Sequence, residues 1–349
     1  MLLLSFGGPE GPTQVMPFLR MVTAGRQVPA ERLAEVAEHY RAFGGRSPIN
    51  DQCRSLLRAL RTELDEHDLP LPLYWGNRNW HPLLADTVAA MTADGVRRAL
   101  VFATSAYSSY STCRQYREDL TEARATVPGA PELVKLRPFF NHPGFVEAVA
   151  DRLASTLADL PGPQRAAARL VFTAHSIPCA MAATSDYEIQ LAESARLVVE
   201  RLAEQAGHVT GTSRPGSGDP ARPWDLVFQS RSGPPQVPWL EPDVDVHLRA
   251  LADAGTEVVV LVPIGFVSDN MEVLYDLDAR AMGTAAELGL TVVRAPTVGT
   301  HPRFVTMIRE LVRERALDRP RRHVGLLPPR PDDCAADCCP APRCGPRTV

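Results

Sequence analysis

The chain has 349 residues, of which 45% are hydrophobic and 22% are charged, and its net charge is −4 at pH 7. This length exceeds what one hydrophobic core usually organises, so two domains are expected. The chain lacks the basic excess typical of nucleic-acid-binding proteins, and no apolar run approaches the ~20 residues that span a bilayer. The first residues also lack the basic region of a signal peptide, so we expect a cytoplasmic protein without stable membrane insertion.

Strand and helix patterns alternate through the first part of the chain. Short apolar runs predict strands that are covered on both faces, as in parallel sheets. The predicted strands cover residues 2–5, 72–76, 98–103 and 132–136. Apolar residues at helical spacing predict helices over residues 13–22, 30–41, 47–60, 83–94 and 116–125.

The pattern then restarts after residue 142. Further strands are predicted at 169–173, 225–229, 257–262 and 291–294, with helices at 143–157, 187–206, 244–254, 272–288 and 302–316. Two successive sets of such units predict an α/β protein with two similar Rossmann-like, doubly wound parallel-sheet domains facing a cleft. We expect the domains to cover residues 1–142 and 143–317, with the last helix able to pack back on the first domain. Residues 318–349 form a Pro- and Cys-rich tail that cannot form a core of its own.

Two polar segments follow predicted strands of the second domain. His175 ends one strand, and Asp269, Glu272 and Asp276 follow another. Ligands bind at the carboxyl ends of strands in open α/β sheets, and histidine accepts protons near neutral pH. Intervals of three and four residues would place the three acids on one helix face, where a proton or a divalent ion would relieve their repulsion. A structural histidine and a solvated acidic face are the alternatives.

Two glycine-rich turns, at residues 5–9 and 43–48, precede predicted helices. Glycines permit close backbone approach to a ligand, and a helix start with Ser47 as cap and Arg46 nearby would favour an anionic group. Ordinary strand-to-helix turns would look the same. No phosphate-binding glycine motif is present, so we expect no nucleotide cofactor.

Several segments together resemble the ferrochelatase family, whose members insert ferrous iron into a porphyrin. They are LLLSFGGPEGP, FGGRSPIN, YWGNRNW, ATSAYSSYSTCRQY, LVKLRPFF, FTAHSIP, FQSRSGPPQVPWLEP and VPIGFVSDNMEVLYDLD. HSIP followed by GFVSDxxEVLYDLD is the most specific part of the match, which runs from residue 2 to residue 278. These segments are most similar to those of the actinobacterial members, which act on coproporphyrin III.

The resemblance implies an enzyme with Fe²⁺ and coproporphyrin III as substrates, and with an iron donor or a downstream enzyme of haem synthesis as a partner. His175 would take pyrrole protons or guide the metal, Glu272 would be its acidic partner, and Asp276 would extend the acidic path. Phe6 falls where some relatives place a tyrosine beside the macrocycle. Many relatives have a histidine at the position of Asn270, so a metal relay there is in doubt.

Coproporphyrin carries four propionates, and the resemblance suggests which side chains contact the porphyrin. Trp239, in the Pro-rich segment 229–242, would form a lid or a pocket wall. The expected carboxylate contacts are Arg26, Arg46, Ser47, Ser105 and Tyr116.

Four of the seven cysteines crowd the end of the chain. Some ferrochelatases hold a [2Fe–2S] cluster with three C-terminal cysteines and one from the body. The resemblance implies Cys113, Cys334, Cys339 and Cys344 as its ligands, and Cys338 could replace Cys334 or Cys339. Structural zinc and free thiols are the alternatives.

Three other functions stay open from the sequence. Protoporphyrin IX is the near alternative as substrate. The same site could serve a non-catalytic tetrapyrrole or metal carrier. A cobalt or nickel chelatase for an earlier tetrapyrrole is the third, although such enzymes usually rely on several histidines and this chain offers one that is well placed.

Overall fold

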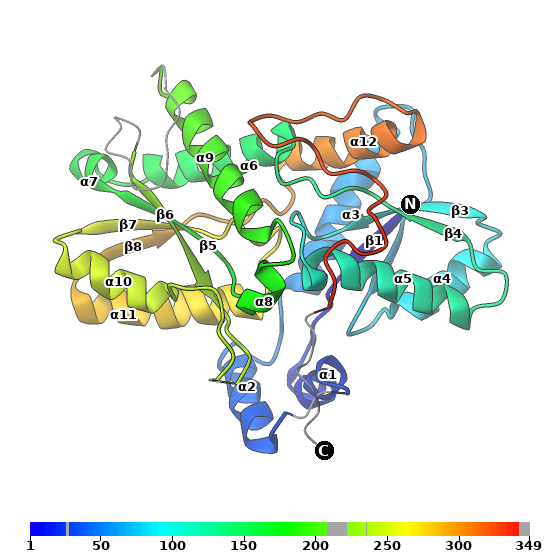
Figure 1. The fold of residues 1–349 in the computed structure, drawn as a ribbon, viewed down its shortest axis with the longest axis horizontal. Helices are drawn as coiled ribbons and strands as arrows, with labels where there is room; N and C mark the ends of the chain where they lie inside the picture. The colour runs from blue at the N-terminus through cyan, green and yellow to red at the C-terminus, as the bar shows by residue number, and fades with distance from the viewer. Residues whose placement is uncertain (26–27, 208–221, 235, 342–349) are drawn as a thin grey trace.

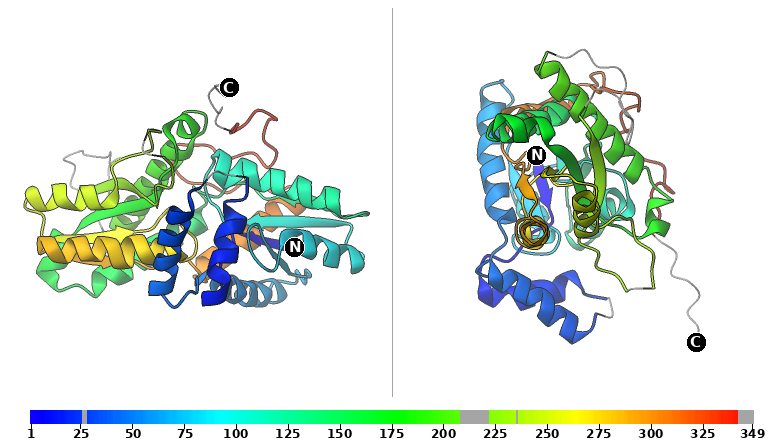
Figure 2. Two further views of the ribbon diagram at one scale, coloured as in Figure 1. Left: turned by 90° about the horizontal axis from the view of Figure 1, so that it is seen from below. Right: turned by 90° about the vertical axis from the view of Figure 1, so that its left-hand side faces the viewer.

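The computed structural model describes residues 1–25, 28–207, 222–234 and 236–341. Within these residues, eight strands form two separate four-stranded sheets in which all neighbouring strands are parallel. Helices cover both faces of each sheet (Figure 1 and Figure 2). The predicted fold class, two similar Rossmann-like halves, is therefore confirmed.

The first sheet has the order β2-β1-β3-β4. Its strands are β1 (Leu2–Ser5), β2 (Tyr74–Asn77), β3 (Arg98–Ala103) and β4 (Glu132–Lys135). Leu2 and Leu4 point to one face and pack with α4 (Leu84–Ala93) and α5 (Gln115–Thr126), while Leu3 points to the other and packs with α3 (Ile49–Asp65). Burial on both faces explains why these strands read as continuous apolar runs.

The second sheet repeats this plan with the order β6-β5-β7-β8. Its strands are β5 (Arg169–His175), β6 (Trp224–Gln229), β7 (Val258–Val262) and β8 (Thr291–Arg294). Val171 and Leu261 pack on one face with α10 (Val244–Asp253), the π-helix η3 (Val273–Ala281) and α11 (Met282–Leu288). Phe172 and Val260 pack on the other with α6 (Pro143–Ala158) and α9 (Tyr187–Gln205). In both sheets the strand that comes first in the sequence is a central strand. β1 lies between β2 and β3, and β5 lies between β6 and β7.

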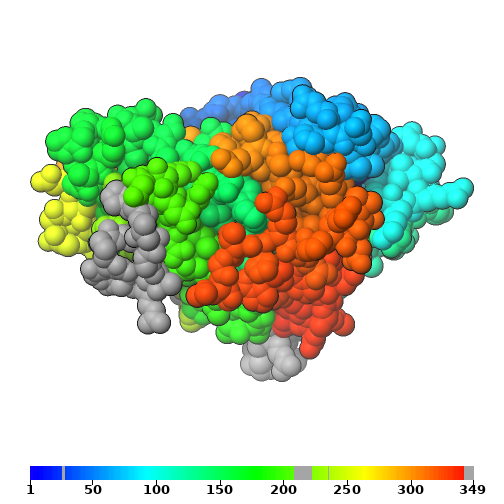
Figure 3. All heavy atoms as spheres, turned by 90° about the horizontal axis from the view of Figure 1, so that it is seen from above, coloured from blue at the N-terminus to red at the C-terminus, as the bar shows by residue number. Residues whose placement is uncertain are grey.

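The end of the chain ties the two halves together. In α12 (Pro302–Ala316), Arg309 pairs with Glu63 of α3 at 2.7 Å. The buried Arg137 donates to both carboxylate oxygens of Glu314, at 2.8 and 3.1 Å. Residues 318–341 contain no helix or strand and lie on the surface beside α12 (Figure 3). One large core contains residues of both sheets, and the domain boundaries at 142 and 317 stay a prediction.

Most predicted elements are present with shifts of a few residues at their ends. The helices whose bounds have not yet been given are η1 (Pro12–Gln14), α1 (Val15–Val22), α2 (Ala30–Ala42), η2 (Tyr110–Arg114), α7 (Gly162–Ala167) and α8 (Cys179–Ala182). The sequence missed α7 and α8, because helices this short show no periodicity. In the part of the chain that the structure describes, no helix is long and apolar enough to cross a membrane.

Candidate active site

The site forms where β5 and β7 end side by side in the second sheet. His175 is the last residue of β5, and the segment after β7 leads into the helix that carries Glu272. This segment passes so close to β5 that a Cβ on Gly265 would lie 2.7 Å from the Cα of Ala174. The close approach brings His175 Nε2 to 3.3 Å from Glu272 Oε1. The two segments singled out in the sequence therefore meet.

Hydrogen bonds fix the orientation of the His175 ring. Its Nδ1 bonds to the carbonyl oxygen of Ser176, which leaves Nε2 directed at Glu272. The Tyr187 hydroxyl donates to the carbonyl oxygen of His175 at 3.0 Å. The Ser176 hydroxyl donates to the carbonyl oxygen of Leu240 at 2.8 Å, so the HSIP segment is tied to the loop after β6.

The electrostatic balance makes His175 and Glu272 an ion pair at neutral pH. Burial alone would lower the pKa of His175, but the negative charge and hydrogen bond of Glu272 raise this pKa to about 9. Burial would raise the pKa of Glu272, but the charge and hydrogen bond of His175 hold it below its usual value. The two side chains are surrounded by protein, yet 31% and 42% of their surfaces stay accessible. A ligand can therefore reach them.

Asp276 follows Glu272 at the start of the π-helix. It accepts a hydrogen bond from Ser230, and Arg280 Nε lies 3.8 Å from its Oδ1. Burial raises the pKa of Asp276, which makes this carboxyl easier to protonate than an ordinary aspartate. Ser230 has a φ of +64°, which is rare for a residue other than glycine, and sequence reasoning missed its role.

Asp269 does not belong to this acidic pair. It precedes the helix, and its Oδ1 lies 3.3 Å from Arg294 Nη1 and accepts a hydrogen bond from Thr297. The prediction that Asp269 shares one helix face with Glu272 and Asp276 is wrong. Helical spacing was applied across a helix start, and residues 273–281 wind as a π-helix.

Asn270 has a structural role at the start of the same helix. Its Oδ1 accepts a hydrogen bond from the backbone N–H of Val273 at 3.0 Å, as a capping side chain does. Burial raises the pKa of Glu272, and a hydrogen bond from Asn270 adds to the effect of His175 in lowering it. Asn270 therefore caps the start of the helix that carries Asp276.

The two glycine-rich turns pack against each other. Gly45 has a φ of +70°, and a Cβ there would lie 2.5 Å from the Cα of Pro12. The N–H of Ser47 donates to the carbonyl oxygen of Pro9 at 2.9 Å, and the side chain of Ser47 is buried. The predicted Ser47 cap is wrong, because α3 follows Pro48 and has no side-chain cap.

The other expected porphyrin contacts differ in exposure. Phe6 is exposed and meets Phe18 edge to face at 6.4 Å. Arg46 forms an exposed ion pair with Asp51, and Ser105 is half-buried. Arg26 lies outside the described residues.

Two further expected contacts are aromatic. Tyr116 is buried in the first half, with the guanidinium of Arg78 4.5 Å from its ring centre. Trp239 is half-buried and pairs through its backbone with Pro178, directly after HSI. Tyr40 of α2 was not anticipated, because nothing in a regular helical pattern distinguishes it. Burial, and then the charge of Glu272, raise the pKa of Tyr40, and its ring packs edge to face on Phe18.

Tail cysteines approach the first half of the molecule. A hydrogen bond from Cys113 lowers the pKa of Cys334 to about 7, and the sulfurs of Cys338 and Cys339 lie 3.5 Å apart. Cys344 lies outside the described residues. Among the residues that the structure describes, no group of three or more His, Cys, Asp or Glu side chains is arranged so that it could hold a metal ion.

The fold and this site together define a chelatase-type protein. The sirohydrochlorin chelatase SirB from Bacillus subtilis subspecies spizizenii, solved in complex with cobalt, has a similar fold, with a TM-score of 0.50 over 91% of this chain and 94% of that one. The two sequences are 11% identical, so this likeness concerns the fold alone.

Sequence comparison assigns the family. The sequence model of the ferrochelatase family matches residues 1–316. The coproporphyrin III ferrochelatase of Frankia alni is 56% identical, covering 99% of this chain and 88% of that protein. The protein of the same name from Streptomyces griseus is 52% identical, covering 98% and 93%. The chain belongs to the ferrochelatase family and is a metal-chelating lyase.

Proposed function

We propose that this enzyme inserts ferrous iron into coproporphyrin III in haem biosynthesis, with His175, Glu272 and Asp276 as its catalytic residues. The observation that carries the proposal is the accessible ion pair between His175 and Glu272, 3.3 Å apart at the carboxyl ends of β5 and β7. The names of the two actinobacterial relatives support coproporphyrin III as the porphyrin.

Metallation requires a base, because two pyrrole N–H protons must leave as the metal enters. In the free enzyme His175 holds a proton, since Glu272 raises its pKa to about 9. A ferrous ion near Glu272 would cancel that support, so His175 would release its proton to solvent water and become able to accept one from a pyrrole. Glu272 would guide the metal, and Asp276, whose pKa is raised by burial, would pass the second proton outward.

The porphyrin would lie against the aromatic and polar side chains near this edge. Phe6 and Trp239 offer flat apolar surfaces, while Arg46 and Ser105 are accessible to propionates. The burial of Ser47 and Tyr116 suggests that these two side chains support the contact surface from beneath. Arg26 completes the proposed set of propionate contacts.

The first experiment is anaerobic insertion of Fe²⁺ by the purified protein into coproporphyrin III and, in parallel, protoporphyrin IX. A clear preference for coproporphyrin III supports the proposal. Preference for protoporphyrin IX contradicts it and favours the alternative substrate. Porphyrin binding without metallation of either would favour a non-catalytic carrier.

We also propose that Cys113, Cys334, Cys339 and Cys344 hold a [2Fe–2S] cluster. The donor chemistry fits, because thiolates are the usual ligands of such clusters. One cation lies against these thiols, since Lys135 Nζ is 3.6 Å from Cys113 Sγ, and a second lies beside the neighbouring Cys338, whose Sγ is 3.5 Å from Arg330 Nη2. Visible absorption with iron, sulfide and zinc analysis of the anaerobically purified protein tests this. Zinc, or no bound metal, would contradict it.

The proposed setting of this reaction is the cytoplasm. The support is the lack of a membrane-spanning helix in the described ranges. Cell fractionation with an antibody against the protein tests this, and recovery with the membrane fraction at high salt would contradict it.

A further inference from the structure

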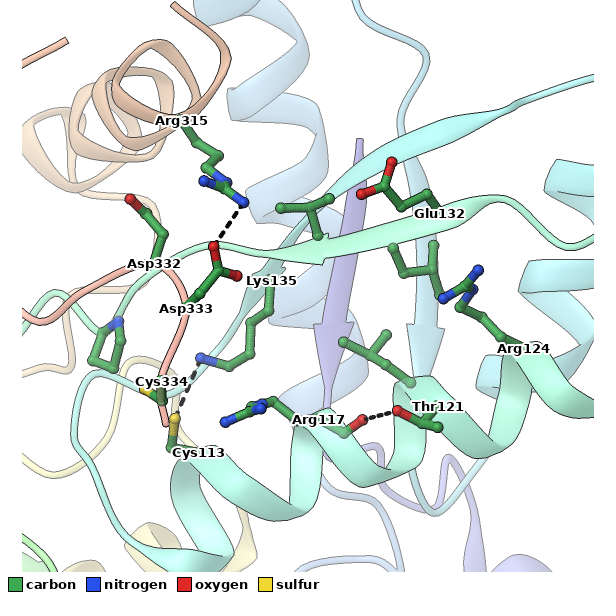
Figure 4. Close-up of a pocket in the computed structure, with 14 residues that line it drawn as sticks. Cys113, Arg117, Thr121, Arg124, Glu132, Lys135, Arg315, Asp332, Asp333 and Cys334 are labelled. Atoms are coloured by element: carbon green, nitrogen blue, oxygen red, sulfur yellow. Dashed lines mark hydrogen bonds and ion pairs between the residues drawn. The ribbon is translucent and has the colours of Figure 1, made fainter. Parts of the chain in front are cut away.

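A second, polar pocket lies in the first half of the molecule, between the edge strand β4 and α5. Its volume is about 220 Å³, and the end of α12 and the tail close it on one side (Figure 4). The residues that line it are Cys113, Arg117, Leu120, Thr121, Arg124, Glu132, Leu133, Val134, Lys135, Pro138, Arg315, Asp332, Asp333 and Cys334. None of the proposed catalytic residues is among them.

Each acid of the pocket already has a cationic partner. Glu132 lies 3.3 Å from Arg98, a residue outside the lining. Asp332 lies 2.7 Å from Arg321 of the tail, also outside the lining. The negative charges of Glu132 and Asp332 are therefore balanced by cations that lie outside the lining.

The third acid, Asp333, takes up one pocket cation. Its carboxylate lies 3.1 Å from Arg315 of α12, and Figure 4 shows this pair at the rim, away from α5. Three cations of the lining remain: Arg117, Arg124 and Lys135.

These three cations have no acidic partner within the described ranges. The ammonium of Lys135 contacts only the sulfur of Cys113 at 3.6 Å and the carbonyl oxygen of Leu136 at 3.3 Å. Arg117 and Arg124 lie two turns apart on the same face of α5, and neither guanidinium forms an ion pair with any described residue. Figure 4 shows Arg117 and Lys135 at the end of the pocket beside Cys113, with Arg124 at the other end.

We propose that this pocket binds a small polyanion with two or three carboxylate or phosphate groups. The planar guanidinium groups suit bidentate binding of either group, and Lys135 adds a point charge between them and the thiols. A water molecule needs only about 10–15 Å³ of such space, so a volume of about 220 Å³ is ample for an anion the size of pyrophosphate or citrate.

The position of the pocket gives the bound anion a second effect. Its walls come from α5, β4 and the tail segment 332–334, so an anion that bridges Arg117 and Lys135 neutralises repulsion next to the docked tail. The pocket contains none of the proposed catalytic residues, and Cys113 and Cys334, two of the proposed cluster ligands, form one of its walls.

Calorimetric titration of the full-length protein with pyrophosphate, and separately with citrate, tests the proposal. At low ionic strength at least one of the two should bind with a stoichiometry of one. The double variant Arg117→Gln/Arg124→Gln should weaken that binding about tenfold or more, because two charge-assisted contacts are lost. The anion that binds more tightly identifies whether carboxylate or phosphate chemistry is preferred.

Arg61→Gln is the matched control. Arg61 is an exposed residue of α3 that, like Arg117, forms no ion pair with a described residue, and it is not part of the pocket. This variant should bind as the unaltered protein does. Equal weakening by both variants would mean diffuse screening of surface charge and would overturn the proposal, as would the absence of saturable binding of either anion. Iron insertion should be unchanged in all variants.

Discussion

The two sheets share one strand order, but the polar residues that end their first strands differ in exposure. β1 ends at Ser5, which is fully buried and accepts a hydrogen bond from Thr104 at 3.2 Å. Its counterpart β5 ends at His175, which stays accessible and pairs with Glu272. Ser5 therefore hydrogen-bonds within its own half, whereas His175 remains accessible to a ligand.

The neighbouring strands β2 and β6 both end in a buried amide that bonds within its own half, and they differ in what that bond supports. β2 ends at Asn77, whose amide donates to the carbonyl oxygen of His81 at 3.1 Å, within a turn of the same half. β6 ends at Gln229, whose amide donates to the backbone of Glu272 at 3.1 Å and supports the residue that pairs with His175. The same topology thus builds a packed scaffold in one half and a reactive pair in the other. Fold alone does not decide which half carries the chemistry.

The largest effect should come from removing the base. His175→Ala should lower the turnover number for iron insertion about 10²–10⁴-fold, the range typical of a lost general base. Porphyrin binding, measured by fluorescence quenching, should remain. Ser5→Ala, at the matching strand end, should leave the rate per folded molecule unchanged. A similar loss of rate in both variants would refute the contrast between the halves.

Glu272→Gln should change the charge state of His175. Without the neighbouring carboxylate, the pKa of His175 should fall from about 9 toward or below its ordinary 6.5, as followed by NMR titration of the ring. Turnover should also drop, by about tenfold or more, because the acidic partner is lost. An unchanged pKa would show that Glu272 does not hold the proton on His175.

The same ion pair predicts a pH dependence of stability. A raised histidine pKa gives stability that is fully present below pH 6.5 and is lost as the pH rises through about 9. The lowered pKa of Glu272 gives stability that is present above 4.5 and is lost as the pH falls through the lower folded-state value. The difference in unfolding free energy between the unaltered protein and Glu272→Gln should therefore shrink as the pH rises from about 6.5 to about 9. A constant difference up to pH 10 would contradict this.

The glycine turns of the first half should matter for stability and not for chemistry. Gly45→Ala places a Cβ against the backbone of Pro12 at a φ of +70°, which should cost about 1–3 kcal/mol of unfolding free energy. Gly44→Ala is the matched control, since its φ is +72° but no atom lies within 4 Å of the added Cβ. Denaturant unfolding should show a larger loss for Gly45→Ala.

The smallest effect concerns the capping residue Asn270. Asn270→Ala should cost about 1 kcal/mol of stability, because the N–H of Val273 loses its acceptor. Asn270→Asp should restore most of it, since aspartate also caps. If Asn270→Ala abolished iron insertion without a change in stability, a direct metal role at this position would be favoured over capping.

The sequence predicted the parallel sheets and the meeting of His175 with Glu272, because apolar runs mark buried strands and ligands gather at strand ends. It failed where local geometry departs from regular patterns. The placement of Asp269 depends on the π-helix and on Arg294, and neither the winding nor the partner can be read from spacing. Ser230 was missed because its left-handed backbone has no glycine to signal it.

The tail has a mechanical consequence for how a large, flat molecule can enter. It leaves α12 beside α3 and α6, the N–H of Val324 donates to the carbonyl oxygen of Asn141, and Arg114 of η2 donates to the carbonyl oxygen of Ala336, so the tail braces the halves against hinge opening. By contrast, α1 and α2 have a small core of their own around Phe18 and Ala37 and project from one edge of the molecule (Figure 1). Elements with few shared core contacts open at the lowest free energy. An outward motion of α1 and α2, while the two halves keep their relative position, is therefore the least costly way to admit a macrocycle.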